Sequence, residues 1–268
     1  MDGVPPEMIE HYERFDEGAR LADAEGMLEW DRTIDILARH LPPPPARILD
    51  VGGGPGRYAH HLTEMGYRVH LVDPVPRHVE QARRGPLTGA EIGDARQLDH
   101  ADAAFDAVLL MGPLYHLQER CDRLRALAEA RRVLGSGGVV AAAAVSRFAP
   151  ALDGLDRGFI DDPRFRDIVA GDLHDGRHHN PTGELDYFTT AYLHHPEELR
   201  AELDAAGFAA PVVLAVEGIG WAAGDLELRR RDPGRWRILL ELLRILEGEP
   251  SLLGASPHLL ALGTVEEI

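Results

Sequence analysis

The chain has 268 residues, 44% of them hydrophobic and 27% charged, which is the composition of a folded domain and excludes a disordered protein. Its formal net charge of −17 argues against a nucleic-acid partner, because such proteins owe much of their affinity to basic surfaces. Its one cysteine, Cys121, excludes an internal disulfide framework and a zinc module built on several cysteines.

The chain offers no segment suited to a membrane. Its first residues lack the basic and apolar regions of a secretory leader. The longest apolar run, residues 139–145, is far shorter than the ~20 residues that a spanning helix needs. We therefore expect a soluble protein of the cytoplasm with no membrane partner.

The first part of the chain predicts helices. Residues 7–40 carry apolar side chains at helical spacing, and the four prolines at 42–45 cannot continue that pattern. We expect residues 1–45 to form an N-terminal helical cap, followed by a second domain at 46–268.

From residue 47 onward, short apolar runs alternate with helical patterns. Five strands and the helices between them are predicted, the strands at 48–51, 67–72, 90–92, 105–110 and 138–145. This alternation indicates a Rossmann-like, doubly wound α/β sheet that is mostly parallel.

The remaining chain is less regular. Residues 146–193 show no clear period, which is typical of a lid or binding insertion, and a second insertion is expected at about 218–256. Helices are predicted at 196–206 and 234–246. The strands at 211–216 and 258–265 lack a long crossover between them, so we expect an antiparallel last strand.

The strongest motif is the run from Asp50 to Gly56, between the first strand and its helix. Its glycines allow a sharp turn and a close approach to a ligand, and the N-terminus of the following helix supplies backbone amide donors. Two further acids, Asp73 and Asp94, follow the next two strands. Asp73 is placed to accept hydrogen bonds from ribose hydroxyls, and Asp94 to meet an adenine amino group.

The motif differs from the G-x-G-x-x-G turn of dinucleotide dehydrogenases. An acid at position 50 would repel a pyrophosphate but suits a ligand that carries an α-amino group and a sulfonium. Over residues 46–145 the pattern resembles the class I S-adenosylmethionine-dependent methyltransferases, in the group that acts on small molecules. The resemblance implies S-adenosyl-L-methionine as the cofactor and S-adenosyl-L-homocysteine as its product.

The resemblance assigns roles residue by residue. The cofactor-binding residues that it implies are Asp50, Gly52, Gly53, Gly54 and Gly56 at the methionine part, Asp73 at the ribose, Pro74, Asp94 and Ala95 at the adenine, and Met111 near the reactive methyl. Segment 110–117 matches the stretch that follows the fourth strand in this family.

Departures from neighbouring subfamilies narrow the chemistry. The fourth strand is followed by Met111-Gly112-Pro113-Leu114, without the Asn/Asp-Pro-Pro-aromatic tetrad of amide and amino-base methyltransferases. No acids stand where metal-dependent catechol-type enzymes carry them, and no catalytic cysteine follows the strand. We therefore expect metal-independent methyl transfer to nitrogen or oxygen of a small or medium organic acceptor.

His116 is the candidate catalytic residue. It follows the fourth strand, where it could act as a general base or could instead contact the cofactor or an ordered water; we favour the contact. The other histidines, at 174–179 and 194–195, could suggest a metal site, but they lack a helical ligand pattern and favour a polar lid.

The aromatic residues Tyr187, Phe188 and Tyr192 could form either an acceptor-binding wall or the packing of the lid. The substrate-binding candidates are Tyr12, Tyr115, Tyr187, Tyr192 and His195. Two other functions stay open: a non-catalytic module that binds S-adenosylmethionine or a nucleotide, and a nicotinamide-dependent oxidoreductase. The sequence is compatible with a monomer or a homodimer.

Overall fold

The structure is a computed structural model that describes residues 23–266. Within that range the chain builds a seven-stranded sheet with the order β3-β2-β1-β4-β5-β9-β8. Its strands are β1 (Arg47–Val51), β2 (Arg68–Asp73), β3 (Gly89–Ile92), β4 (Phe105–Leu110), β5 (Leu134–Val145), β8 (Ala209–Ala215) and β9 (His258–Thr264). Strands β1 to β5 pair in parallel, while β9 runs antiparallel to both of its neighbours. The predicted Rossmann-like class and the antiparallel last strand are confirmed.

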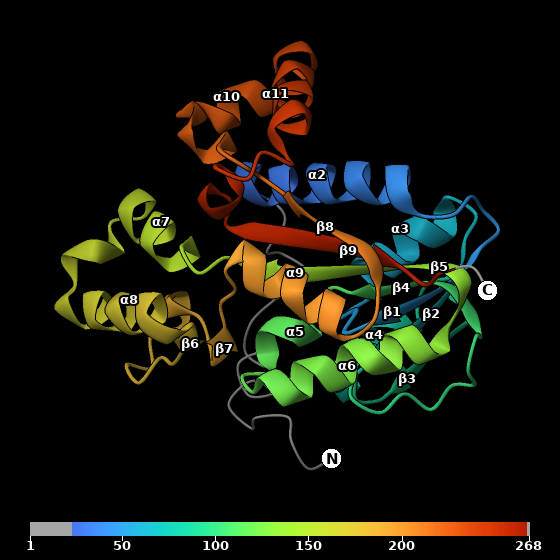
Figure 1. The fold of residues 1–268 in the computed structure, drawn as a ribbon. Helices are drawn as coiled ribbons and strands as arrows, with labels where there is room; N and C mark the ends of the chain where they lie inside the picture. The colour runs from blue at the N-terminus through green and yellow to red at the C-terminus, as the bar shows by residue number, and fades with distance from the viewer. Residues whose placement is uncertain (1–22, 267–268) are drawn as a thin grey trace.

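Helices cover both faces of the sheet (Figure 1). One face carries α2 (Ala24–His40), α3 (Arg57–Glu64) and α4 (Pro76–Ala82), whose apolar residues join one buried cluster. The other carries α5 (Pro113–His116), α6 (Arg120–Val133) and α9 (Pro196–Ala205) over a second cluster. Because each layer is amphipathic, two cores form on either side of the strands.

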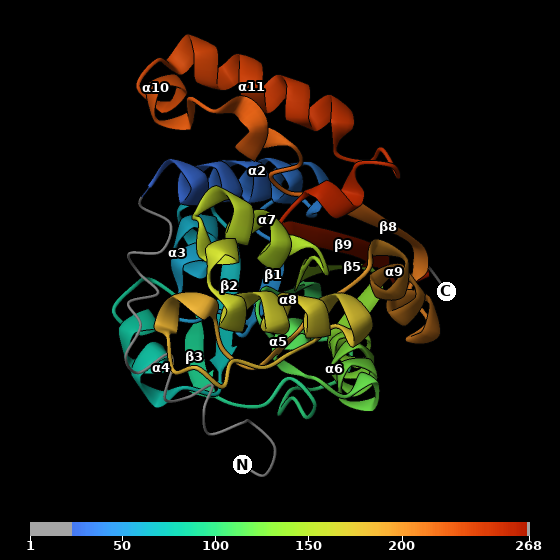
Figure 2. The ribbon, with the colours of Figure 1, turned by 90° about the vertical axis from the view of Figure 1, so that its left-hand side faces the viewer.

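The segment after β5 is more regular than its sequence predicts. It folds into α7 (Ala149–Asp156), α8 (Pro163–Asp175) and a short hairpin of β6 (Arg177–His178) and β7 (Ala191–Tyr192), with single 3₁₀ turns at Phe159–Asp161 and Leu185–Tyr187. These elements bury a small core of their own and project beyond the carboxyl ends of the parallel strands (Figures 1 and 2). The sequence did not predict these helices, because the buried positions of α8 include the charged Asp172 among apolar residues.

The later insertion lies on α2. Helices α10 (Leu226–Arg230) and α11 (Pro233–Leu246) follow a 3₁₀ turn at Gly220–Ala223, and another turn, Leu253–Ala255, leads into β9. Trp236 and Leu243 of α11 pack with Leu28 of α2, and the Trp236 indole donates to Asp31 at 2.7 Å. Among residues 23–266, no helix combines the length and hydropathy that a bilayer-crossing segment requires.

Candidate functional site

The glycine-rich turn after β1 depends on residues without side chains. Gly52, Gly54 and Gly56 adopt positive φ angles of 72°, 56° and 91°, which disfavour other residues. A Cβ atom on Gly52 would lie 2.6 Å from the Pro113 Cδ atom, so glycine lets the turn after β4 close on this loop. At Gly54 a Cβ would meet no described atom within 4 Å, which leaves open space above the loop.

Asp50 lies beneath this loop at the end of β1. Its side chain has no exposed surface, and neither carboxylate oxygen has a hydrogen-bond partner among the described residues. Burial, reinforced by the negative charge of Asp73, raises the pKa of Asp50 from 3.8 to about 7. A buried carboxyl without donors is costly, which is typical of a group kept for binding rather than for folding.

Asp73, at the end of β2, organises the loop. Its Oδ2 atom accepts the Gly54 amide at 2.9 Å, and its Oδ1 atom accepts the Val75 amide at 2.9 Å. The His78 ring lies 3.1 Å from the same Oδ1 atom. Asp73 is only 4% exposed, so this acid connects the glycine loop to the start of α4.

The third predicted acid follows β3 on the neighbouring strand. Because β3 pairs with β2, Asp94 lies beside the end of β2 that carries Asp73 and Pro74. Its carboxylate holds the Arg96 backbone amide at 2.9 Å and the Arg96 guanidinium at 3.0 Å. Burial opposes ionisation, but these bonds and the Arg96 charge outweigh it and lower the pKa of Asp94. Ala95, the next residue, is buried.

The turn after β4 brings Met111, Tyr115 and His116 to the same edge. The Tyr115 hydroxyl donates to the Met111 carbonyl at 3.2 Å, which fixes the short helix α5. The His116 ring lies 4.6 Å from the Tyr115 ring, centroid to centroid, and 6.2 Å from the Phe188 ring. His116 is therefore half-buried where α5 meets the segment after β5.

Phe188 is one of the aromatic residues that the sequence proposes either for an acceptor-binding wall or for lid packing. It has φ 65° and ψ −177°, a combination found almost only in glycine, so its backbone is strained. Its ring faces both His116 and, at 6.1 Å, His178. Strained residues of this kind concentrate at functional sites. A positive φ at a phenylalanine leaves no sequence signal.

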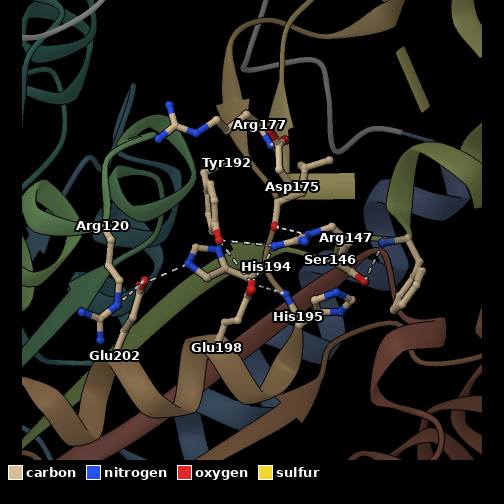
Figure 3. Close-up of polar contacts among 12 residues, drawn as sticks. Arg120, Ser146, Arg147, Asp175, Arg177, Tyr192, His194, His195, Glu198 and Glu202 are labelled. Carbon is tan, nitrogen blue, oxygen red and sulfur yellow. Dashed lines mark hydrogen bonds and ion pairs between the residues drawn. The ribbon is translucent and has the colours of Figure 1, made fainter. Parts of the chain in front are cut away.

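Tyr192 and His195 belong to a polar cluster at the end of β5 (Figure 3). Arg147 donates to Glu198 at 2.7 Å and to the Tyr192 hydroxyl at 3.3 Å. The Tyr192 ring stacks beneath Arg123, whose Cζ atom lies 3.6 Å from the ring centroid. The two arginines thus hold Tyr192 in one orientation.

A buried ion pair supports this cluster from below. Arg123 of α6 donates to Glu202 of α9 at 2.8 Å, and both side chains are almost fully buried. The His194 ring lies 3.3 Å from the same carboxylate, and its burial lowers the pKa of His194 (Figure 3). Removing Glu202 would leave the buried Arg123 guanidinium without its carboxylate partner, so this ion pair holds α6 and α9 together.

The remaining candidates have structural partners. Tyr187 packs with Phe165 and donates to Asp162 at 3.0 Å, which favours lid packing over acceptor contact. His195 begins α9 in a capping box with Glu198, and its ring lies 5.4 Å from Phe148. Tyr12 lies outside the described residues.

The lid histidines and the cysteine also have places in the structure. The buried His178 ring bridges Asp172 at 2.9 Å and the Tyr187 carbonyl at 2.8 Å, so it holds the hairpin to α8. Cys121 is exposed on α6.

Comparison with known proteins shows which family part of the chain resembles. Residues 49–142 match the family described as "Methyltransferase domain". An uncharacterized methyltransferase of Mycobacterium tuberculosis is 36% identical over 99 residues, which cover 37% of this chain and 39% of that protein. The ubiquinone biosynthesis O-methyltransferase of Methylocella silvestris is 36% identical over 119 residues, 41% of this chain and 45% of that protein. The chain thus matches less than half of the length of these relatives.

The fold extends further than the sequence similarity. A chain in the complex between the Haloferax volcanii Trm112 methyltransferase activator and its proposed methyltransferase superimposes with a TM-score of 0.60. It is 17% identical, and the match covers 99% of each chain. Residues 49–142 are thus similar to a methyltransferase domain, and the chain shares its fold with a solved methyltransferase complex.

The residues present fit the cofactor of that family. The unpaired Asp50 carboxyl offers an acceptor for an ammonium group, and the space above Gly54 admits a ligand close to backbone amides. Asp73 and Asp94 line the adjoining strand ends, as the resemblance implies for ribose and adenine.

Proposed function

We propose that this protein transfers the methyl group of S-adenosylmethionine to a nitrogen or oxygen atom of a small or medium organic acceptor. The observation that carries the proposal is Asp50, a fully buried carboxyl without a protein partner beside an open glycine loop. A buried carboxyl of this kind favours a ligand with a positive charge over an uncharged or anionic one.

The cofactor supplies an activated methyl on a positively charged sulfur. The chain's own part is to hold and orient it: Asp50 at the amino acid portion, Asp73 at the ribose, and Pro74, Asp94 and Ala95 around the base. Because Asp73 already accepts two backbone amides, it also sets the shape of the loop before any ligand arrives. Such preorganisation is the main source of rate in a displacement that needs alignment.

The acceptor side is proposed to lie between α5 and the segment after β5. Tyr115, His116, Phe188 and Tyr192 present rings there, and the projecting helices α7 and α8 can cover the strand ends (Figure 2). A covered, aromatic-lined site excludes water and suits a small acceptor better than a macromolecule.

The reaction is proposed to proceed without a metal. The positions after β4 and β5 carry Met111 and Ser146-Arg147, and Arg147 is already paired with Glu198. A cation at the end of β5 would repel a divalent metal ion there. His116 is kept as the candidate residue for contact with cofactor or acceptor, or for proton removal.

Incubation of the purified protein with a metabolite extract and methyl-labelled S-adenosylmethionine tests the proposal. Mass spectrometry should reveal a labelled compound of low molecular mass that forms only with active protein. The Asp73→Ala protein, if folded, serves as the control and should give little label. Binding of the cofactor without any labelled product would favour a non-catalytic module instead.

A further inference from the structure

Three side chains converge at the edge of the sheet, apart from the residues expected to hold the cofactor. His70 lies in the middle of β2, Glu91 on β3, and His100 on the loop that returns from β3 to β4. The Nε2 atoms of His70 and His100 lie 3.6 Å and 3.4 Å from the same Glu91 oxygen, Oε1. The two rings meet edge to face, with centroids 4.9 Å apart.

These polar atoms are buried without the hydrogen bonds that would explain them. Neither Nε2 atom has a hydrogen-bond partner in the described part of the chain, although each is shielded from solvent. Gly89 admits the His70 ring against β3, because a Cβ there would lie 2.5 Å from the ring. Unsatisfied buried nitrogens aimed at one carboxylate need a physical reason.

A second group with similar composition provides a contrast. Glu29, Glu217 and His258 also bring ligand atoms within 4.8 Å of one another. There the Glu217 carboxylate accepts the Ser256 hydroxyl at 3.0 Å and the His258 amide at 3.1 Å, besides the His258 ring. In that group the Glu217 carboxylate and the His258 ring are hydrogen-bonded, whereas the Nε2 atoms of His70 and His100 are not.

We propose that His70, Glu91 and His100 form a binding site for a divalent transition-metal ion, Zn²⁺ in the first instance. Zinc bonds to nitrogen and oxygen are about 2.0–2.2 Å long, so ligand atoms of a tetrahedral site stand roughly 3.3–3.6 Å apart. Two of the three separations here are close to that value. Two imidazoles and one carboxylate are a common ligand set for such ions, with a remaining position for water.

The chemistry of the ligands agrees with this assignment. A neutral imidazole is the form that binds a metal, and the Nε2 atom of His70 lies toward the Glu91 carboxylate without a hydrogen bond. The carboxylate supplies negative charge that offsets part of the ion's charge.

The ion would have a structural effect near the methyltransferase site. It would tie the edge strand β3 and the 93–104 loop to β2, and that loop contains Asp94. The site is independent of the proposed reaction, so either claim can fail without the other.

Metal binding by the chelator-treated full chain tests the proposal. Competition with a chromophoric chelator should show one Zn²⁺ ion per chain, and Co²⁺ should give visible absorption of the intensity expected for four- or five-coordinate sites. His70→Gln, Glu91→Gln and His100→Gln should each weaken Zn²⁺ binding by about 100-fold or more, since even the loss of an outer partner costs about 10–100-fold. The Glu91 side chain is 42% exposed, so of the three substitutions Glu91→Gln should disturb the fold least.

His258→Gln is the matched control, since it removes an imidazole from the other group and should leave the affinity unchanged. Hydrogen exchange should also slow within residues 93–104 when Zn²⁺ is added. The proposal is overturned if Zn²⁺ does not bind, or if His258→Gln abolishes binding while Glu91→Gln and His100→Gln retain it.

Discussion

Replacement of Asp50 by asparagine separates the effect of the buried carboxyl on stability from its effect on cofactor binding. In the wild-type protein the pKa of Asp50 rises from 3.8 to about 7 on folding. Between these values the folded state holds a proton that the unfolded state has released. The free energy of unfolding should therefore fall as the pH rises, by about 1.4 kcal/mol per pH unit and about 4 kcal/mol in total, and level off above about pH 7.

Asparagine has nearly the same shape and no charge, so the variant should lack this pH dependence. Urea unfolding at about pH 5 and about pH 8 measures it: the wild type should lose about 3 kcal/mol more than Asp50→Asn between the two conditions. The same variant should bind S-adenosylhomocysteine more weakly by about 1–3 kcal/mol, because an ammonium group loses its charged acceptor. Compared with the wild type, Asp50→Asn should thus be more stable at about pH 8 and should bind S-adenosylhomocysteine more weakly.

Asp106→Asn is the matched control on the next strand. Asp106 is 40% exposed, and its hydrogen bond with Arg47 lowers its pKa, so its contribution to stability is lost only in acid below the usual range of a carboxyl. That variant should keep the wild-type change between about pH 5 and about pH 8. If Asp50→Asn and wild type show the same change, Asp50 is not a buried neutral carboxyl and the reasoning fails.

Three further predictions concern the binding edge and its cover. Asp73→Ala should weaken S-adenosylhomocysteine binding by about 1–3 kcal/mol in calorimetry; it should also lower the free energy of unfolding by roughly 2–3 kcal/mol, since two backbone amides lose their acceptor. Unchanged affinity in the folded variant would refute the ribose assignment. His116→Ala should mainly reduce cofactor affinity and retain the pH–rate profile, whereas a fall in kcat of ~10²–10⁴ with loss of the limb near pH ~6.5 would identify a general base instead. Hydrogen exchange should show α7 and α8 becoming protected when cofactor and acceptor bind, while residues 189–194 are protected throughout; equal protection of the helices in both states would count against a lid.

The sequence predicted those parts of the candidate site that depend on residues close together in the chain. The glycine turn after β1 and the acids that end β2 and follow β3 occupy fixed positions in a strand–turn–helix repeat, so their convergence follows from the parallel sheet. The burial of Asp73 was not foreseeable, because its donors come from Gly54 and Val75. An acid at a strand end can be exposed or buried, depending on the loop that closes over it.

Contacts between residues far apart in the chain could not be predicted from the sequence. Arg123, Glu202 and His194 meet only because α6 and α9 pack side by side on one face of the sheet. His70 and His100 stand thirty positions apart and meet through the pairing of β2 with β3. The helix α8 was missed because its buried positions, including Phe165 and Asp172, mix apolar and charged residues and hide the helical period.

Calorimetric titration with S-adenosylhomocysteine and with NAD⁺ distinguishes a methyltransferase cofactor site from a nicotinamide site. We expect one saturable site for S-adenosylhomocysteine, no detectable heat with NAD⁺, and a weaker S-adenosylhomocysteine site in Asp50→Asn. Binding of NAD⁺ in place of S-adenosylhomocysteine, or equal S-adenosylhomocysteine affinity in wild type and Asp50→Asn, would contradict this expectation.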